Sequence, residues 1–261
     1  MAVDLAFTET GGDEPDGGPP LVILPGLFGS KRNWSAIARE LGRHRRVITA
    51  DLRNHGESPW TDRHDYPGLA ADVAQLIESQ AAGRASVLGH SMGGKAAMML
   101  ALARPELVER LVVVDIPPVA STGTPIDYVQ AMRALPLASY SRRSEVADAL
   151  AEAIPDRGVR NFLSLNAVDG PGGLEWRLNL AALERDFPAI LGFPEIEAGR
   201  TFPGPALFLS GGRSPYVRPE HLPEIERLFP AAVFETIPDA GHWVHADTPA
   251  AFVAAVNRFL A

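Results

Sequence analysis

Gly89-His90-Ser91-Met92-Gly93-Gly94 follows the apolar stretch 85–88 (ASVL) and precedes a helical pattern. The pattern Gly-x-Ser-x-Gly between a strand and a helix is typical of the sharp turn that presents a serine nucleophile at the edge of an α/β sheet. Glycines are needed there because side chains beside the strained serine would collide. The start of the following helix offers free N–H groups and positive dipole potential to an oxyanion. The stretch predicts a nucleophilic Ser91; the alternative interpretation is a tight structural turn.

Further apolar stretches alternate with helical patterns along the rest of the chain. Most lack the alternation of apolar and polar residues that a half-exposed sheet requires, so we expect helices on both faces. The expected strands are 21–24, 47–50, 85–88, 111–114, 206–209 and 232–237, preceded by a short strand near 5–8. This alternation predicts an α/β fold with a mostly parallel central sheet flanked by helices.

The segment 117–204 interrupts this rhythm. A structureless loop of such length is improbable in a compact domain, so we expect an inserted helical cap, with helix-like pieces at 126–135, 144–154 and 174–185. The core is then expected from residues 1–116 and 205–261. Its last helix is expected to have Thr248 as N-cap and Pro249 in the first turn, and the polar stretch 11–20 is expected to be a surface loop.

Composition excludes several classes of function. The 32 acidic and 24 basic residues give a net charge of −8 with no basic stripe, which argues against a nucleic-acid partner. The absence of cysteine excludes disulfides, thiolate metal sites and a cysteine nucleophile. No apolar stretch approaches the roughly 18–20 residues of a membrane span, and the N-terminus does not resemble a secretory signal. We therefore expect a cytoplasmic protein without metal or cofactor, of undefined oligomeric state.

A serine hydroxyl needs a base that removes its proton. His242 follows the expected strand 232–237 and precedes the last helix, which is where this architecture carries its base. His245, three residues later, is the alternative base. A metal site at these two histidines would lack a third clustered ligand.

The acid that orients the imidazole is expected at the carboxyl edge of the sheet. The usual position is the turn after the next-to-last strand, where this chain has Ser214 and no carboxylate. Asp115 ends the preceding apolar strand, and a carboxylate there is costly to desolvate without a partner or a purpose. We assign the acid to Asp115, with Asp239 on the histidine loop as the alternative.

An oxyanion hole needs two N–H donors aimed at one point. One is expected from Met92, which follows the nucleophile, and the other from Leu27 in the glycine-containing loop 25–30. The neighbouring Phe28 is expected to line the acyl pocket; the alternative is a loop that only packs under the cap. His55 lies in an early loop rich in hydrogen-bonding groups and is interpreted as part of the scaffold.

In combination these segments resemble the α/β-hydrolase superfamily, and within it a group of small bacterial serine esterases and their mitochondrial relatives. The matching segments are Leu27-Phe28-Gly29-Ser30 with Asn33-Trp34, 51–58, 89–95, Val114-Asp115-Ile116-Pro117, Gly211-Gly212 with Ser214-Pro215-Tyr216-Val217, and Gly241-His242-Trp243-Val244-His245. The resemblance implies ester or thioester hydrolysis by a Ser–His–Asp triad under a helical cap. It also favours Asp115, because relatives with serine in the Gly-Gly-x-Ser-Pro turn rely on the earlier carboxylate. The chain departs from the family at Pro25-Gly26, where the usual His-Gly supplies a histidine that braces the loop.

The sequence thus predicts a cofactor-free hydrolase for small-molecule esters or thioesters of short- to medium-chain acyl groups, with acyl-CoA among the candidates. Aromatic residues of the expected cap favour apolar acyl groups, and Trp176 is the expected substrate contact among Phe162, Trp176, Phe187 and Phe193. A cofactor-free haloperoxidase or perhydrolase would use the same triad. A non-catalytic small-molecule binding protein of the same fold is the alternative outside the enzymes.

Overall fold

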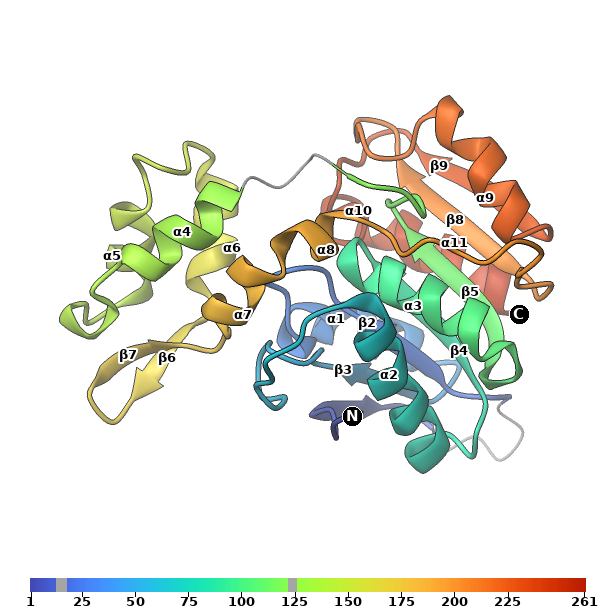
Figure 1. Cartoon of the computed structure of the whole chain (residues 1–261), viewed down its shortest axis with the longest axis horizontal. Coiled ribbons are helices and arrows are strands. Elements are labelled where there is room, and N and C mark those ends of the chain that lie inside the picture. The colour runs from blue at the N-terminus through green and yellow to red at the C-terminus, as the bar shows by residue number, and fades with distance from the viewer. Residues whose placement is uncertain (13–17, 122–125) are drawn as a thin grey trace.

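Seven strands form the central sheet of the computed structural model, which describes residues 1–12, 18–121 and 126–261 (Figure 1). Their order is β1-β3-β2-β4-β5-β8-β9; β1 pairs antiparallel with β3, and the other neighbours pair in parallel. The strands are β1 (Phe7–Thr10), β2 (Leu21–Leu24), β3 (Val47–Ala50), β4 (Ala85–His90), β5 (Val108–Val114), β8 (Ala206–Gly211) and β9 (Ala232–Ile237). The predicted fold class is confirmed.

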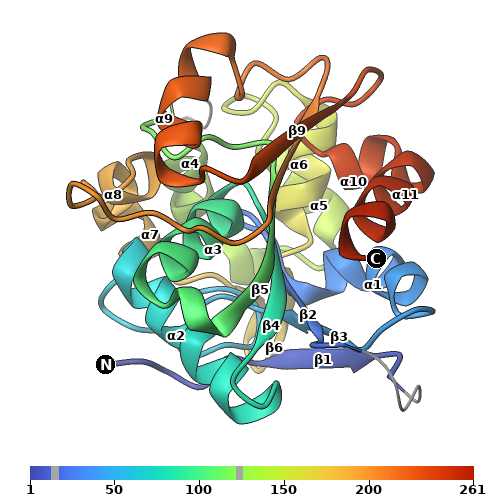
Figure 2. The same ribbon diagram turned by 90° about the vertical axis from the view of Figure 1, so that its right-hand side faces the viewer.

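Helices cover both faces of this sheet, which is why its central strands consist of consecutive buried residues (Figure 2). One face packs against α1 (Ser35–Leu41) and α11 (Pro249–Leu260). The other packs against α2 (Tyr66–Gln80), α3 (Met92–Ala103) and α9 (Leu222–Leu228). Because β2, β4, β5 and β8 run parallel, their carboxyl ends lie at one edge of the sheet, where the loops that follow them meet.

The inserted segment (residues 117–204) lies between β5 and β8, and its elements from α4 to α7 form the left part of Figure 1. Its described residues form α4 (Ile126–Ala134), α5 (Arg143–Ala149), α6 (Arg157–Ser164), β6 (Ala167–Gly170), β7 (Gly173–Trp176), α7 (Leu180–Arg185) and α8 (Phe187–Leu191). The expected helix at 174–185 is wrong in its first part, because β6 and β7 form an antiparallel hairpin there. Gly173 has a φ of 120° at the turn, a conformation that favours glycine.

Two ends of elements also differ from the sequence-based expectation. The first strand is 7–10 and not 5–8, because Phe7 pairs with Ala50 and Thr10 with Val47. Thr248 occupies the N-cap position of α11, but its hydroxyl donates to the Val244 carbonyl and does not accept from the helix. The expected surface loop at 11–20 lies partly outside the described residues.

Within the described ranges, no helix combines the length and apolar character that a membrane crossing requires.

Candidate active site

Ser91 lies in a sharp turn between β4 and α3, with a φ of 53° in the left-handed region. The flanking glycines make the turn sterically feasible: a Cβ on Gly89 would lie 2.1 Å from the Gly93 carbonyl oxygen, and one on Gly93 would lie 2.3 Å from the Leu24 oxygen. The Ser91 amide donates to the Val114 oxygen at 3.0 Å, which ties the turn to the neighbouring strand. This is the geometry of the predicted nucleophile turn.

Asp115 and His242 meet at the carboxyl edge of the sheet. The Asp115 Oδ2 atom lies 2.7 Å from His242 Nδ1, although the two residues are 127 positions apart in the chain. Asp115 directly follows β5 and is 1 % exposed, whereas the His242 side chain is 20 % exposed. A buried carboxylate is thus held against one nitrogen of a partly accessible imidazole, and the other nitrogen remains for proton transfer.

Two further donors satisfy the Asp115 carboxylate. Its Oδ1 atom accepts from the Gly211 amide at 3.1 Å, and its Oδ2 atom accepts a short hydrogen bond from the Ser214 hydroxyl. Such bonds are required because an ionised carboxylate away from water is costly unless it is hydrogen-bonded. Ser214, which stands where the acid was first sought in the sequence, therefore donates to Asp115, the residue that follows β5.

His242 is also in contact with the rings of Tyr216 and His90. The Tyr216 ring stacks on it with centroids 4.0 Å apart and planes at 19°. The His90 Nε2 atom donates to the His242 carbonyl oxygen at 2.8 Å, and burial keeps the pKa of His90 well below its usual range. Sequence reasoning named neither residue as part of the site, although both lie in segments that it singled out.

The alternative base and the alternative acid make other contacts. His245 stacks on Trp34 at 3.9 Å between centroids. Burial, followed by the nearby His242 imidazole, lowers the pKa of His245 to about 3. Asp239 is exposed and makes a hydrogen bond through its backbone carbonyl, which accepts from Arg213 Nη2 at 2.6 Å. Neither residue contacts both Asp115 and Ser91.

The loop 25–30 and the start of α3 bring two free amides to the serine. None of the hydrogen bonds among the described residues involves the amide N–H of Leu27 or of Met92. The Phe28 amide, in contrast, donates to His55 Nε2 at 3.2 Å. The Leu27 and Met92 amides expected to hold an oxyanion are thus both without a hydrogen-bond partner among the described residues.

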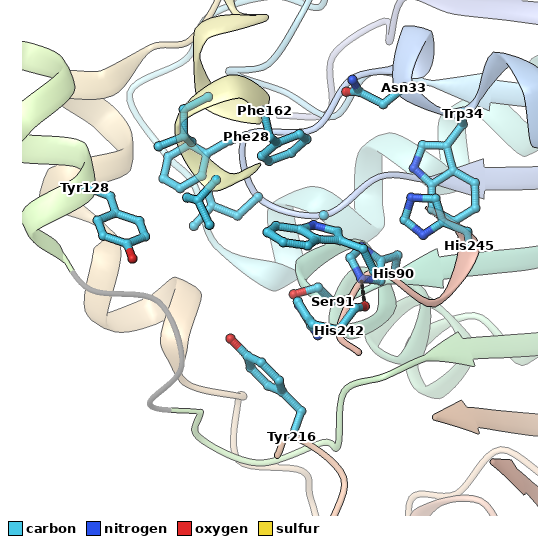
Figure 3. Close-up of a pocket in the computed structure, with 15 residues that line it drawn as sticks. Phe28, Asn33, Trp34, His90, Ser91, Tyr128, Phe162, Tyr216, His242 and His245 are labelled. Atoms are coloured by element: carbon cyan, nitrogen blue, oxygen red, sulfur yellow. Dashed lines mark hydrogen bonds between the residues drawn. The ribbon is translucent and has the colours of Figure 1, made fainter. Parts of the chain in front are cut away.

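A cavity of about 220 Å³ opens above Ser91 (Figure 3). The core loops and the inserted segment both line it, with Gly26, Leu27, Phe28, Asn33, Trp34, His90, Ser91, Tyr128, Val159, Phe162, Leu163, Tyr216, His242, Trp243 and His245. Figure 3 shows Ser91 and His242 together, with Phe28 and Phe162 on the far side of the cavity. Most of the lining is apolar, so the cavity suits an apolar group attached to a reactive carbonyl.

Trp176, which was expected to contact substrate, is not among the residues that line this cavity. It lies on β7, and its indole N–H donates to the Met132 carbonyl oxygen at 3.1 Å. The strand, unrecognised from sequence, directs the indole toward α4. Among the four aromatic residues expected to serve the cap, Phe162 reaches the cavity.

The described part of the chain contains no group of three or more His, Asp or Glu side chains arranged to hold a metal ion.

Comparisons with known proteins agree with this geometry. A family model described as alpha/beta hydrolase family matches residues 21–256. The sn-1-specific diacylglycerol lipase ABHD11 of Xenopus tropicalis is 45 % identical and aligns over 99 % of this chain and 82 % of its own. Esterase YbfF of Escherichia coli is 37 % identical over 92 % of each chain.

A solved structure, described as a marine microorganism esterase, superposes with a TM-score of 0.92. It is 35 % identical and covers 99 % of this chain and 100 % of that one. The chain belongs to the alpha/beta hydrolase family. The resemblance to small bacterial esterases and the assignment to the carboxylic ester hydrolases are confirmed.

Proposed function

We propose that Ser91, His242 and Asp115 form a catalytic triad that hydrolyses carboxylic esters or thioesters of short- to medium-chain acyl groups. The observation that carries this proposal is the 2.7 Å contact between Asp115 Oδ2 and His242 Nδ1 beside the turn that holds Ser91. Since a carboxylate accepts this bond, Nδ1 carries the hydrogen and Nε2 has the free lone pair that a general base needs.

The reaction follows from these positions. Ser91 Oγ attacks the acyl carbonyl carbon while His242 Nε2 takes its proton, and Asp115 offsets the positive charge on the imidazole. His242 then returns the proton to the leaving alcohol or thiol, and the acyl group stays on Ser91 as an ester. A water molecule, deprotonated by His242, releases the carboxylic acid and regenerates the serine.

The amides of Leu27 and Met92 are proposed to hold the carbonyl oxygen as it gains negative charge. Both are free of partners within the described residues, and Met92 is the first residue of α3, where the helix dipole favours an anion. We also propose that the inserted segment acts as a cap, because Tyr128, Val159 and Phe162 from it close the cavity over Ser91.

The cavity supports the proposed substrate class. Its volume of about 220 Å³ is below the roughly 300–1,000 Å³ of sites for drug-sized ligands, which favours short- to medium-chain acyl groups. Hydrolysis of a diacylglycerol is the second candidate, because the 45 % identical relative that spans nearly the whole chain is named as a lipase for that substrate. A panel of nitrophenyl esters of increasing chain length, acyl-CoA thioesters and diacylglycerols would rank these substrates by kcat/KM. Peracid formation, measured alongside, would identify a perhydrolase.

Replacement of the nucleophile is the primary test. Ser91→Ala is expected to lower kcat for a p-nitrophenyl ester by at least about 10⁴-fold and to abolish labelling by a fluorophosphonate probe, because no other hydroxyl is held in this turn. Ser141→Ala, at an exposed serine of the inserted segment, is the matched control and should retain full activity. Full activity in Ser91→Ala would refute the triad.

A further inference from the structure

The loop that carries the Leu27 amide is held in an unusual conformation. Phe28, the next residue, has a φ of 63°, which is rare for a bulky side chain. Both of its backbone polar groups are bound by side chains: its N–H donates to His55 Nε2 at 3.2 Å, and its carbonyl oxygen accepts from Asn166 Nδ2 at 2.9 Å. These two bonds fix the peptide planes that follow the Leu27 amide.

The tautomer of His55 follows from its other partner. His55 Nδ1 lies 3.0 Å from the Arg53 carbonyl oxygen, and because a carbonyl can only accept, Nδ1 carries the hydrogen. Nε2 is left with its lone pair directed at the Phe28 amide. The side chain is 1 % exposed, and burial lowers the pKa of His55, so the ring stays neutral and Nε2 stays an acceptor.

Pro25 cannot brace this loop through a side-chain hydrogen bond, whereas His55 does contact the loop. The family commonly has a histidine immediately before the glycine at position 26 to brace this loop, whereas proline has neither a side-chain hydrogen-bonding group nor a backbone N–H. His55 reaches the same loop from the end of the neighbouring strand β3, 27 positions away in sequence.

A second chain of hydrogen bonds leads from the segment after β3, which also carries His55, to Met92. The Thr61 amide donates to Asn54 Oδ1 at 2.7 Å, which fixes the orientation of this side-chain amide. Asn54 Nδ2 then donates to His64 Nδ1 at 3.3 Å, which leaves the hydrogen on His64 Nε2, 3.3 Å from Met92 Sδ. The segment after β3 therefore contacts Met92 and also Phe28, the residue that follows Leu27.

We propose that His55 is a positioning residue of the oxyanion hole: by accepting the Phe28 N–H it holds the Leu27 amide aimed at the substrate oxygen. The inference rests on the proposed hydrolysis at Ser91. His55 does not itself touch substrate, because the residues that line the cavity do not include it. Its loss should therefore affect the transition state, in which the oxygen is charged, more than the bound substrate.

Three substitutions separate the acceptor from the rest of the side chain. His55→Gln places an amide oxygen close to the position of Nε2, so the acceptor is kept. His55→Asn can still donate to the Arg53 carbonyl but is too short to reach Phe28. His55→Leu fills a similar volume with no polar atom. His44→Leu, the same change at an exposed histidine, is the control.

We expect His55→Asn and His55→Leu to lower kcat about 10- to 100-fold with KM changed less than about threefold, because removing an oxyanion donor outright costs more than misaligning one. His55→Gln should recover most of the rate, and His44→Leu should equal the wild type. A trifluoromethyl ketone, which forms a charged tetrahedral adduct with the serine, should lose affinity in parallel with kcat. Fluorophosphonate titration gives the fraction of active enzyme, so that all rates refer to folded sites.

Wild-type kcat in His55→Asn would overturn the inference, as would equal losses in His55→Asn and His55→Gln. If His55→Leu does not fold, the comparison of the asparagine and glutamine variants still decides the matter. Failure of the proposed function looks different, since the wild type itself would then show no hydrolysis dependent on Ser91.

Discussion

Asp115 combines two energetically unfavourable features, a buried carboxylate and a positive φ. It is a carboxylate at 1 % exposure, and its φ of 54° lies in the region that most residues avoid. Three donors offset the desolvation: the Gly211 amide, the Ser214 hydroxyl and the His242 imidazole. The combination of strain and burial beside the Ser91 turn supports the proposed role of Asp115 as the orienting acid.

At the scale of this residue we predict that Asp115→Asn lowers kcat about 10⁴-fold, because the amide would no longer hold His242 in the required tautomer or offset its charge. Steady-state hydrolysis of a nitrophenyl ester measures the change. Asp239→Asn, at the exposed carboxylate on the histidine loop, is the matched control and should stay within about twofold of the wild type. A loss of only a few-fold in Asp115→Asn would exclude it as the orienting acid.

At the scale of elements, Lys95 links the nucleophile helix α3 to the inserted segment. Its side chain is 1 % exposed, and Nζ donates to the carbonyl oxygens of Leu191 and Gly192 at the end of α8, each at 2.7 Å. It also lies 5.8 Å from the centroid of the Tyr66 ring. Burial lowers the pKa of Lys95 to about 7, and among the described residues no carboxylate counteracts this shift.

This shift predicts a dependence of stability on pH. In unfolded chains lysine has a pKa near 10.4, so between pH 7 and 10 the unfolded state binds more protons than the folded one. The free energy of unfolding should rise with pH in that window, with a contribution of up to about 1.4 kcal/mol per pH unit. Lys95→Met keeps the side-chain length and should remove this contribution.

Urea unfolding of the wild type and Lys95→Met at pH 7, 8 and 9 measures the difference in slope. Below pH 6 both states of the wild type bind the proton, so the two proteins should there have parallel pH dependences. Equal slopes above pH 7 would show that Lys95 is protonated in the folded protein throughout.

At the scale of the whole molecule, the inserted segment is joined to the core by charges around Glu57. Its carboxylate contacts Lys31 and Arg32 from the core and Arg177 from the loop after β7. Hydrogen bonds from Lys31 and then Arg177 are the main causes that lower the pKa of Glu57 to about 2. Lys31 is itself 5 % exposed and also pairs with Asp51 at 2.8 Å.

Because the folded pKa is below the unfolded value, this stabilisation is present above about pH 4.5 and is lost as the pH falls toward 2. Glu57→Gln should reduce the free energy of unfolding by about 1 kcal/mol at pH 7, a small effect because the side chain is 41 % exposed and screened by salt. The difference should shrink below pH 4.5 and in 1 M NaCl.

Glu152→Gln, at an exposed carboxylate with no ion pair in the described part of the chain, is the control for the loss of one charge. Denaturant unfolding across pH 3–8 measures all three proteins. If the difference in unfolding free energy between the wild type and Glu57→Gln stays constant with pH, the Glu57 carboxylate contributes little to stability through its charge.

Local patterns in the sequence were sufficient for most of the core. The strands 21–24 and 47–50 match the structure at both ends, because buried parallel strands are short apolar runs bounded by polar turns. The edge strand 232–237 also matches at both ends, although most of its residues are not buried. The turn at Ser91 was equally clear, since its glycines are dictated by contacts within a few residues. The inserted segment was harder to predict. Its hairpin and the orientation of Trp176 depend on packing against α4 and against the 3₁₀ turn Leu137–Ser139, and a local sequence pattern does not encode such packing.

The chain by itself determined that a serine, a histidine and a carboxylate follow strands of one parallel sheet, because the order of apolar runs and glycines is a local property. Tertiary structure decided which groups meet. The 2.7 Å contact across 127 residues, the Ser214 hydroxyl on Asp115 and the His55 acceptor under Phe28 all arise where loops from different strands converge at one edge. Hydrogen bonds of this kind require distances to be right within tenths of an ångström, and such distances are set by the packing of the whole sheet and its helices.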